Sequence, residues 1–385
     1  MVLGSGLAEL ACALHLRSAG RDVTVLEPRS SPGGRQHSLE IDGFRFDTGP
    51  VTPVGAESVA AVFQVAGERH GDWIDLMPVD PICRAHYPDG TTLDVHRDPH
   101  RTAENVRKLC GRREALAYQR FLRYARSPVP PGIFFQDPRT SRLFGCEALF
   151  GFSPVKAGWW PGGGPHALAK ALAAVAEKQG ISIRYRTRAT DWQTRGRRVV
   201  AVRTDDGERL AADAVVVPGP ADATGPSSLV LHLGTSIAYS QLAHHNVHFG
   251  QTWRRARNQV LVRGELMTDP TILVTCPTRT DPALAPTDRH THQVVVPVPN
   301  LRRAPLPWRG PAARAYAGEI MATLEARGYL DLGAGVQVSY VVTPADWARP
   351  DMNYGVPDTP LANVVGTGPR LTDGARTARR VTRIA

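Results

Sequence analysis

The apolar residues of this chain fall into short continuous runs that alternate with runs at helical spacing, a pattern that predicts strands and helices in turn. Residues 2–6 predict the end of a buried strand, residues 7–20 a helix stopped by Gly20, and residues 22–27 a second strand. A strand, a glycine turn, a helix and a strand in this order predict a βαβ unit with parallel strands.

The same patterns continue along the rest of the chain. The further predicted elements are a hairpin (82–96, turning at Asp89-Gly90), one helix (98–124), a break (127–132), an alanine-rich helix (166–180), strands (181–187, 197–210, 213–219 and 293–301), a helix (311–328) and a final strand, glycine turn and helix (363–381). Strands that alternate with helices favour an α/β fold.

Composition adds a basic surface to this picture. The 385 residues carry a formal net charge of +10, and 42% are apolar and 21% charged, as in a globular protein. A solvated exterior is the simplest explanation of the charge, and attraction to anionic lipid is the alternative. The sequence contains no basic recognition helix, RNP-like stretch or zinc module, so we expect no nucleic-acid partner.

The cysteines and the apolar runs bear on location. Five cysteines are scattered and none forms a CxxC pair, which indicates reduced thiols. No signal peptide precedes the first predicted strand, and no apolar run approaches the ~18 residues of a transmembrane helix. We therefore expect a cytoplasmic protein, and attraction to lipid would add peripheral contact with the inner membrane face.

The glycine turn near the start of the chain carries the candidate chemistry. In dinucleotide-binding βαβ units, one glycine makes the tight turn, a second lets the backbone approach the pyrophosphate, and a third lets helix and strand pack closely. Gly4 and Gly6 match the first two, and Glu27 ends the second strand, where an acid binds the ribose hydroxyls. Glu9 replaces the third glycine, and its carboxylate either faces the phosphates or points to solvent. The pattern favours dinucleotide binding over a plain turn.

A second glycine pair follows in "SPGGR". Gly33 and Gly34 offer backbone N–H groups without side chains, and Arg35 adds a planar cation suited to phosphate. An ordinary turn is the alternative explanation. "GFRFDTGP" comes next, at residues 43–50, and by itself predicts only a strand and a turn.

Taken in order, the GxG turn, Glu27, "GGR" and "FDTGP" resemble the phytoene desaturase (carotenoid desaturase) family of FAD-dependent oxidoreductases. The likeness covers nearly the whole chain, through "DPRTSRLFGCEALFGFSP", "WWPGGGPHALAKAL", "ADAVVVPGPADA", "LAHHNVHFG", "TDPALAP" and "VVVPVPNL". It implies an α/β fold, with a Rossmann-like FAD-binding domain of the GR2 type and an interleaved α+β substrate domain. The implied FAD-binding segments are residues 1–78, 158–225 and 355–385, and the implied substrate segments are residues 79–157 and 226–354.

The resemblance also implies a function. Such enzymes introduce double bonds by moving hydride from substrate carbons to flavin, so FAD is the expected cofactor and an apolar, phytoene-like polyene the expected substrate. The family offers no sharp acid–base side chain that could be carried over as catalytic. The positions that match its flavin-side motifs are Gly4, Gly6, Glu27, Gly33, Gly34, Arg35, Gly49, Pro50, Gly366 and Gly368.

The chain is shorter than the family pattern in three places. Typical members have more residues before the first strand, a long helical insertion before "WWPGGG", and a further Pro/Gly-rich turn after the last strand. The family builds much of its substrate tunnel in that insertion. Two alternatives therefore stay open, a non-catalytic member and a flavin oxidoreductase that acts on a smaller substrate.

Two further features have plain explanations. His244, His245 and His248 stand close in sequence, but adjacent residues of a strand point to opposite faces, so we expect no metal site. The aromatic and basic stretch at residues 133–152 fits core packing, with membrane contact as the alternative.

Overall fold

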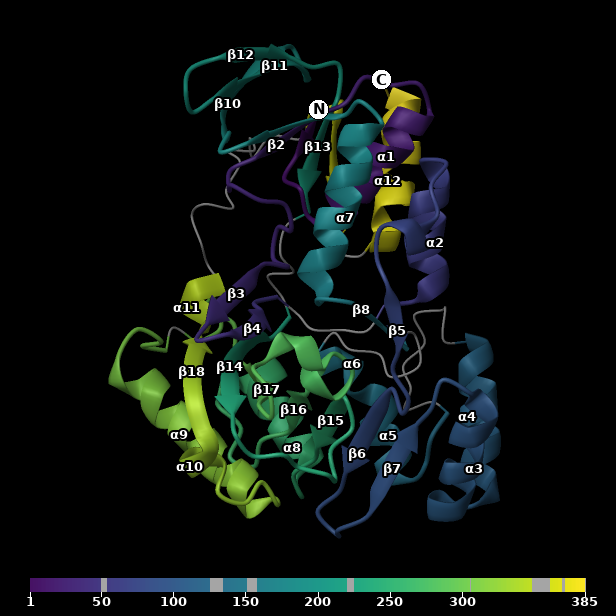
Figure 1. The fold of residues 1–385 in the computed structure, drawn as a ribbon, viewed down its shortest axis with the longest axis vertical. Coiled ribbons are helices and arrows are strands. Elements are labelled where there is room, and N and C mark those ends of the chain that lie inside the picture. The colour runs from purple at the N-terminus through teal and green to yellow at the C-terminus, as the bar shows by residue number, and fades with distance from the viewer. Residues whose placement is uncertain are drawn as a thin grey trace.

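The computed structural model describes residues 1–49, 54–124, 134–150, 158–219, 225–304, 306–347, 361–368 and 371–384. Figure 1 shows two large sheets, one above the other in this view. Two short antiparallel pairs lie between them. These pairs are β3 (Ser38–Ile41) with β4 (Phe44–Asp47), and β5 (Leu76–Pro78) with β8 (Trp159–Pro161).

The upper sheet is the parallel sheet that the sequence predicts. Its strand order is β19-β13-β1-β2-β9, and every neighbouring pair is parallel. The strands are β19 (Val364–Thr367), β13 (Val215–Pro218), β1 (Val2–Leu3), β2 (Thr24–Glu27) and β9 (Ser182–Tyr185). Successive residues of β1 face opposite sides of the sheet, because Val2 packs among the helices and Leu3 against a smaller sheet. The predicted βαβ unit is confirmed.

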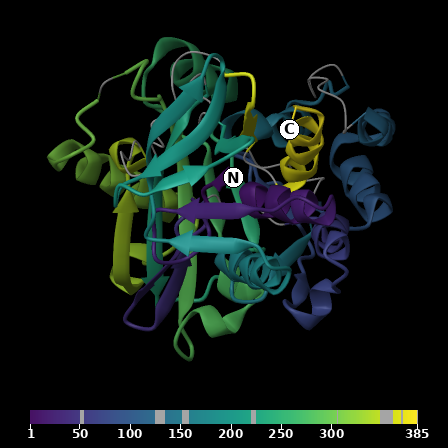
Figure 2. The ribbon, with the colours of Figure 1, turned by 90° about the horizontal axis from the view of Figure 1, so that it is seen from above.

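Helices cover one face of this sheet and a three-stranded antiparallel sheet covers the other (Figure 2). The helices are α1 (Leu7–Ser18), α2 (Ala56–Val65), α7 (Pro165–Lys178) and α12 (Leu371–Ile384), and the small sheet comprises β10 (Ala189–Arg195), β11 (Arg198–Thr204) and β12 (Arg209–Ala211). Helix α12 crosses α1 closely at Gly374, where a Cβ would lie 2.7 Å from the carbonyl oxygen of Ala8 and from Cβ of Ala11.

The lower sheet has seven strands in the order β18-β14-β17-β16-β15-β6-β7. Its strands are β18 (Val336–Val342), β14 (Ser227–Thr235), β17 (His290–Val298), β16 (Ile272–Thr275), β15 (His245–His248), β6 (Cys83–His86) and β7 (Thr92–Val95). All neighbouring pairs are antiparallel except β15–β6. The predicted hairpin at residues 82–96 is confirmed by β6 and β7.

Each face of the lower sheet is covered by different elements. Leu229 and Val294 pack on α9, whereas Val247 packs on α3, α4 and α5. The β3–β4 hairpin lies over the β14–β17 part of the latter face, with the Phe46 ring 5.6 Å from the His232 ring. The helices of the lower part are α3 (Pro99–Cys110), α4 (Arg112–Tyr124), α5 (Pro138–Gly145), α6 (Glu147–Phe150), α8 (Trp253–Asn258), α9 (Pro311–Ala326), α10 (Leu332–Gly335) and α11 (Pro344–Trp347).

Two secondary-structure predictions need correction. The single helix predicted over residues 98–124 is broken into α3 and α4 at Gly111, whose φ of +90° is incompatible with a continuous helix. Strand β10 was missed, because its one buried aromatic residue, Trp192, stands among polar neighbours. The predicted break at residues 127–132 lies outside the described residues.

The aromatic stretch after residue 133 packs inward. Phe135 and Phe144 are buried and stack with ring centroids 4.8 Å apart, and Phe121 of α4 lies against both. Of the basic residues in the stretch, Arg139 forms an ion pair with Asp89. Core packing, the first of the two explanations, therefore accounts for the described part of this stretch.

Candidate functional site

The turn between β1 and α1 forms the centre of the candidate site. Gly4 has a φ of +84°, a conformation that side chains disfavour, and its amide donates to the carbonyl of Leu26 at 2.7 Å. Gly6 is the N-terminal cap of α1 and provides no side-chain hydrogen bond. The first amides of α1 are therefore directed toward whatever lies beyond the turn, and such amides favour an anion.

Glu27 occupies the predicted place at the end of β2 and is fixed there. It is buried, and its Oε2 accepts hydrogen bonds from the Ser5 amide at 2.9 Å and the Ser5 hydroxyl at 2.6 Å. Its Oε1 accepts from the Arg29 amide at 2.9 Å. Sequence reasoning missed Ser5, although a hydroxyl between the two turn glycines was a usable signal.

The second glycine turn lies directly against the first. The Gly33 amide donates to the Ser5 carbonyl at 2.9 Å, and a Cβ on Gly34 would lie 3.0 Å from Cα of Gly6. The structure thus brings Gly4, Gly6, Gly33 and Gly34 together. The Arg35 side chain is exposed beside them.

Gly49 joins the same region from the end of β4. It is buried, and a Cβ at this position would clash with the carbonyl of Arg35. On its other side, Nε2 of Gln293 donates to the carbonyls of Asp47 and Gly49, at 3.1 Å each. Pro50 lies outside the described residues.

The last two predicted residues follow the edge strand of the upper sheet. Gly366 is in β19 and Gly368 comes just after it. The amide of Gly219, which follows the neighbouring strand β13, donates to the Thr367 carbonyl at 2.7 Å. A Cβ on Gly368 would clash with the carboxylate of Asp373 in the first turn of α12. This turn is therefore acidic.

Glu9 faces the glycine turn and not the solvent. The residue is 9% exposed, and its Oε2 would clash with a Cβ on Gly6. Burial raises the pKa of Glu9 to about 7; its own backbone amide and Arg35 lower it, while Glu27 and Asp373 raise it. Of the two orientations that the sequence left open, the structure has the one in which the carboxylate stands at the start of α1.

A further buried carboxylate, Asp47, was not predicted. Asp47 Oδ1 accepts a hydrogen bond from the His166 amide at 3.0 Å, and so satisfies the first turn of α7. Burial raises the pKa of Asp47 to about 7. The adjacent Gly163 amide donates to Oδ2 of Asp281 at 2.7 Å. The glycine-rich turn before α7 is thus tied to β4 and to the loop before β17.

The histidines near β15 have separate partners. His244 Nδ1 lies 2.6 Å from Oγ1 of Thr280, and His248 Nε2 lies 2.8 Å from the Tyr329 hydroxyl. Burial lowers the pKa of His244 to about 3. Within the described ranges, no three His, Cys, Asp or Glu side chains are grouped as they would be around a metal ion.

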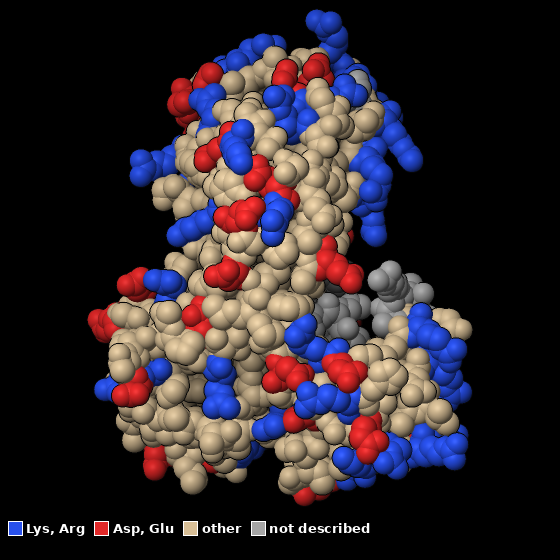
Figure 3. Space-filling model, turned by 45° about the vertical axis from the view of Figure 1, so that its right-hand side comes forward, with Lys and Arg blue, Asp and Glu red and all other residues tan. Residues whose placement is uncertain are grey.

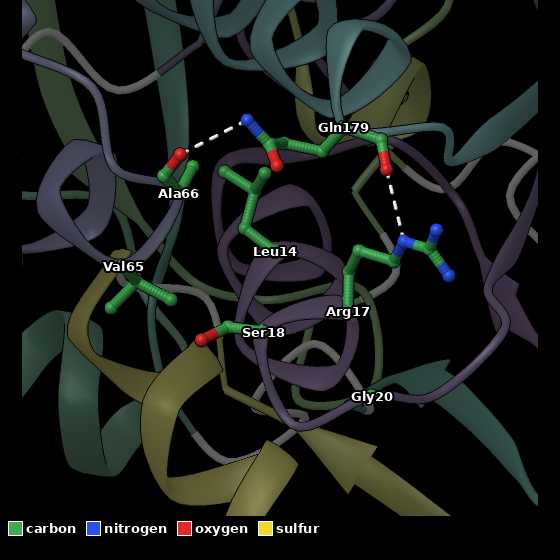
Figure 4. A pocket seen from close by; sticks show the side chains of 7 residues that line it. All are labelled: Leu14, Arg17, Ser18, Gly20, Val65, Ala66 and Gln179. Atoms are coloured by element: carbon green, nitrogen blue, oxygen red, sulfur yellow. Dashed lines mark hydrogen bonds between the residues drawn. The ribbon is translucent and has the colours of Figure 1, made fainter.

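A cleft of about 340 Å³ lies at the carboxyl ends of α1, α2 and α7 (Figure 4). Its lining includes Leu14, Arg17, Val65 and Gln179. Gln179 Nε2 donates to the Ala66 carbonyl at 3.0 Å, and Arg17 Nε donates to the Gln179 carbonyl at 2.9 Å. The glycine turn is at the opposite end of α1, so this cleft is not part of the candidate site.

The geometry agrees with comparisons to known proteins. A family described as "FAD dependent oxidoreductase" matches residues 1–293. The chain is therefore an FAD-dependent oxidoreductase. An oxidoreductase from Methanosarcina mazei has the same fold, with a TM-score of 0.64 at 16% identity over 99% of both chains.

Relatives narrow the class further. The phytoene dehydrogenase of Streptomyces griseus is 34% identical over 440 residues, which cover 96% of this chain and 86% of that protein. The lycopene-forming phytoene desaturase of Pseudescherichia vulneris is 26% identical and covers 97% of this chain and 90% of that protein. The chain belongs to the phytoene desaturase family, as its motifs predicted. Because the first alignment is longer than this chain, that relative carries segments that are absent here.

The residues present fit FAD in their chemistry. Bare backbone at Gly6 and Gly34, where added Cβ atoms would intrude, leaves N–H groups open to a pyrophosphate. Glu27 ends β2 with both oxygens oriented. In its ionised form, Glu9 is unfavourable in this cradle because its charge would repel the phosphates.

Proposed function

We propose that this chain is an FAD-dependent desaturase whose substrate is an apolar, phytoene-like polyene. The observation that carries the proposal is the meeting of three backbone turns, at Gly4, Gly34 and Gly49, beside Glu27. The names of the relatives supply the substrate class. Binding at the carboxyl ends of parallel strands is the general rule for sheets of this kind.

The ten predicted positions divide by role. Gly4, Gly6, Gly33 and Gly34 would hold the pyrophosphate through backbone amides, and Glu27 would accept hydrogen bonds from the ribose. Arg35 would add charge from the exposed side. Gly49 with Pro50, and Gly366 with Gly368, would border the flavin ring.

The protein's part in the reaction is positioning and exclusion of water. Bound flavin supplies the hydride acceptor. Ser5 and the Arg29 amide orient Glu27, while Gln293 holds the backbone at Asp47 and Gly49. The apolar residues of the lower sheet, such as Val247 and Leu273, would help to keep water away from a hydrocarbon substrate.

The test is reconstitution. The purified protein is titrated with FAD by flavin fluorescence, and the complex is mixed without oxygen with phytoene in liposomes. We expect the oxidised flavin absorption to bleach as a longer conjugated polyene appears. Bound FAD that phytoene does not bleach would contradict the substrate, and absence of FAD binding would contradict the function itself.

A non-catalytic member is the second candidate, and Glu9 favours it. A carboxylate ~5 Å from a phosphate charge costs roughly 3 kcal/mol at an effective dielectric of about 20. That cost corresponds to about a hundredfold in affinity. A protein that melts cooperatively but does not bind FAD would support this candidate, and recovery of binding in Glu9→Gln would assign the loss to the charge of Glu9.

The basic surface supports a cytoplasmic enzyme that binds the inner membrane face peripherally. No helix in the described part of the chain is long and apolar enough to cross a bilayer. In Figure 3, Lys and Arg lie along the outer edge of the lower lobe, with Asp and Glu among them, and also on the upper part of the molecule. On α4, Arg113 and Arg120 are exposed beside Leu116 and Tyr124, which are 49% and 53% exposed. Exposed apolar and cationic groups on one helix face suit an anionic lipid surface.

Liposome flotation tests this surface. Each Arg→Gln substitution on α4 should weaken binding to anionic vesicles about fivefold, since an arginine near such a surface contributes about 1 kcal/mol. Arg195→Gln and Arg203→Gln, exposed on the three-stranded sheet, serve as matched controls. Equal losses in both pairs would contradict a specific α4 surface.

A further inference from the structure

A row of polar side chains crosses the lower sheet. In the strand register, His232 of β14 pairs with Gln293 of β17, Gln293 with Thr275 of β16, and Thr275 with His245 of β15. Directly paired residues point to the same face. All four are at least 96% buried, so a continuous line of polar side chains crosses the sheet inside the protein.

Gln293 connects this row to the candidate site. Its Nε2 donates to the carbonyls of Asp47 and Gly49, which are 246 and 244 residues away in sequence. Both protons of the amide nitrogen are thus committed to the end of β4. Its Oε1 has no hydrogen-bond partner among the described residues and adjoins a small cavity lined by Phe46, Asp47 and His232.

The segment that Gln293 holds, at the end of β4, is also closely packed on the side away from Gln293. A Cβ on Gly49 would clash with the Arg35 carbonyl and lie 2.7 Å from Oε1 of Gln36. The Thr48 amide donates to the His37 carbonyl at 2.7 Å. The end of β4 is therefore clamped between the second glycine turn and the lower sheet, and Gln293 is the sheet's part of the clamp.

We propose that Gln293 is a positioning residue, which sets the backbone of residues 46–49 from the substrate-side sheet and thereby tightens FAD binding. The proposal rests on the proposed function for the role of that backbone. A buried amide that donates twice to main-chain carbonyls fixes their direction, whereas an apolar side chain of the same length would leave both carbonyls unpaired.

Gln293→Met tests the proposal because methionine keeps the length and volume but cannot donate. Thr291→Val is the matched control, since Thr291 lies two residues away on the same face and its Oγ1 has no partner within the described ranges. Hydrogen exchange of residues 44–49 is measured without added FAD. We expect about tenfold faster exchange in Gln293→Met, from the loss of two hydrogen bonds, and no change in Thr291→Val.

FAD titration and Gln293→Glu complete the experiment. FAD should bind Gln293→Met about tenfold more weakly than Thr291→Val. Gln293→Glu keeps an acceptor but cannot donate when ionised, so its 44–49 segment should exchange at least as fast as that of Gln293→Met. If residues 44–49 of both Gln293 variants exchanged at the wild-type rate, the proposal would be overturned. Absence of FAD binding by the wild type would count against the proposed function alone, because exchange is measured without FAD.

Discussion

Helices α1 and α7 begin alike, each after a glycine-rich turn and each beside a buried carboxylate whose pKa burial raises to about 7. The carboxylate at α7 is Asp47, which comes from β4 and accepts a hydrogen bond from the His166 amide at 3.0 Å. The carboxylate at α1 is Glu9, which belongs to the helix itself and lies against Gly6. Asp47 joins two distant segments of the chain, whereas Glu9 stands at the helix N-terminus that we assign to a ligand.

The comparison distinguishes a carboxylate that stabilises the fold, Asp47, from one that stands in the way of a bound ligand, Glu9. A helix N-terminus stabilises a negative charge from either source. At α7 that charge ties β4 to the helix and leaves no place for a ligand anion. At α1 the same preference makes Glu9 a competitor of the pyrophosphate. Substitutions that remove one charge at a time should distinguish these two roles.

The largest expected effect is on stability at alkaline pH. A carboxyl whose folded pKa is raised from 4.5 to about 7 stabilises the fold fully below pH 4.5, and this contribution is lost as pH rises to 7. The loss for Glu9 is about 3 kcal/mol. Glu9→Gln should therefore unfold at higher urea than the wild type at pH 8, with the gap closing at pH 4.5. A gap that is independent of pH would show that Glu9 does not titrate in this range.

At pH 8, FAD affinity should rise about tenfold in variants of Glu9, because a carboxyl with a pKa of about 7 can take up a proton when FAD enters, which limits the effect of its charge. At pH 8, Glu9→Gln removes the charge beside the phosphates, and Glu9→Gly also restores the third glycine of the pattern. Fluorescence titration at fixed salt measures both constants. Equal constants for wild type and variants would mean that the Glu9 side chain leaves the turn when FAD enters.

Wild-type FAD affinity should also follow pH. As pH falls from 8 to 6, Glu9 with a pKa of about 7 becomes neutral while the phosphates stay charged. The dissociation constant should fall about tenfold over this interval. In Glu9→Gln it should stay flat, and a slope that persists there would assign the dependence to another group.

The smallest effect is expected at Asp47. Asp47→Asn keeps an oxygen to accept the His166 amide but removes the charge. Its FAD constant should stay within about threefold of wild type, although its stability at pH 8 should rise like that of Glu9→Gln. A large loss of FAD affinity would show that the tie at α7 also shapes the cofactor site.

The sequence predicted the parts of the fold that are local. The unit from Val2 to Glu27 follows from one apolar run, two glycines and one helical pattern, all within a single stretch of chain. The break at Gly111 was missed because one glycine in a helical pattern is usually tolerated. Strand β10 was missed because its face toward the parallel sheet carries few apolar residues.

In the candidate site, too, sequence patterns revealed local features and missed contacts between distant residues. The two glycine turns and Glu27 were found because spacing reveals them, and the family followed from their order. The hydrogen bond from His166 to Asp47 and those from Gln293 to Asp47 and Gly49 were not found, because they join residues more than 100 positions apart. Glu9 was identified as an anomaly, but its direction depends on packing around Gly6 that no local pattern encodes.

The strand order of the upper sheet has a consequence for synthesis on the ribosome. Strand β1 can pair with β2 as soon as Glu27 has emerged, but its other neighbour β13 and the edge strand β19 come from residues 215–218 and 364–367. At 5–20 residues per second, the edge strand follows β2 by roughly 20–70 s. During that delay the apolar face of α1 that later receives Gly374 of α12 is uncovered, so the nascent chain presents a surface that chaperones recognise.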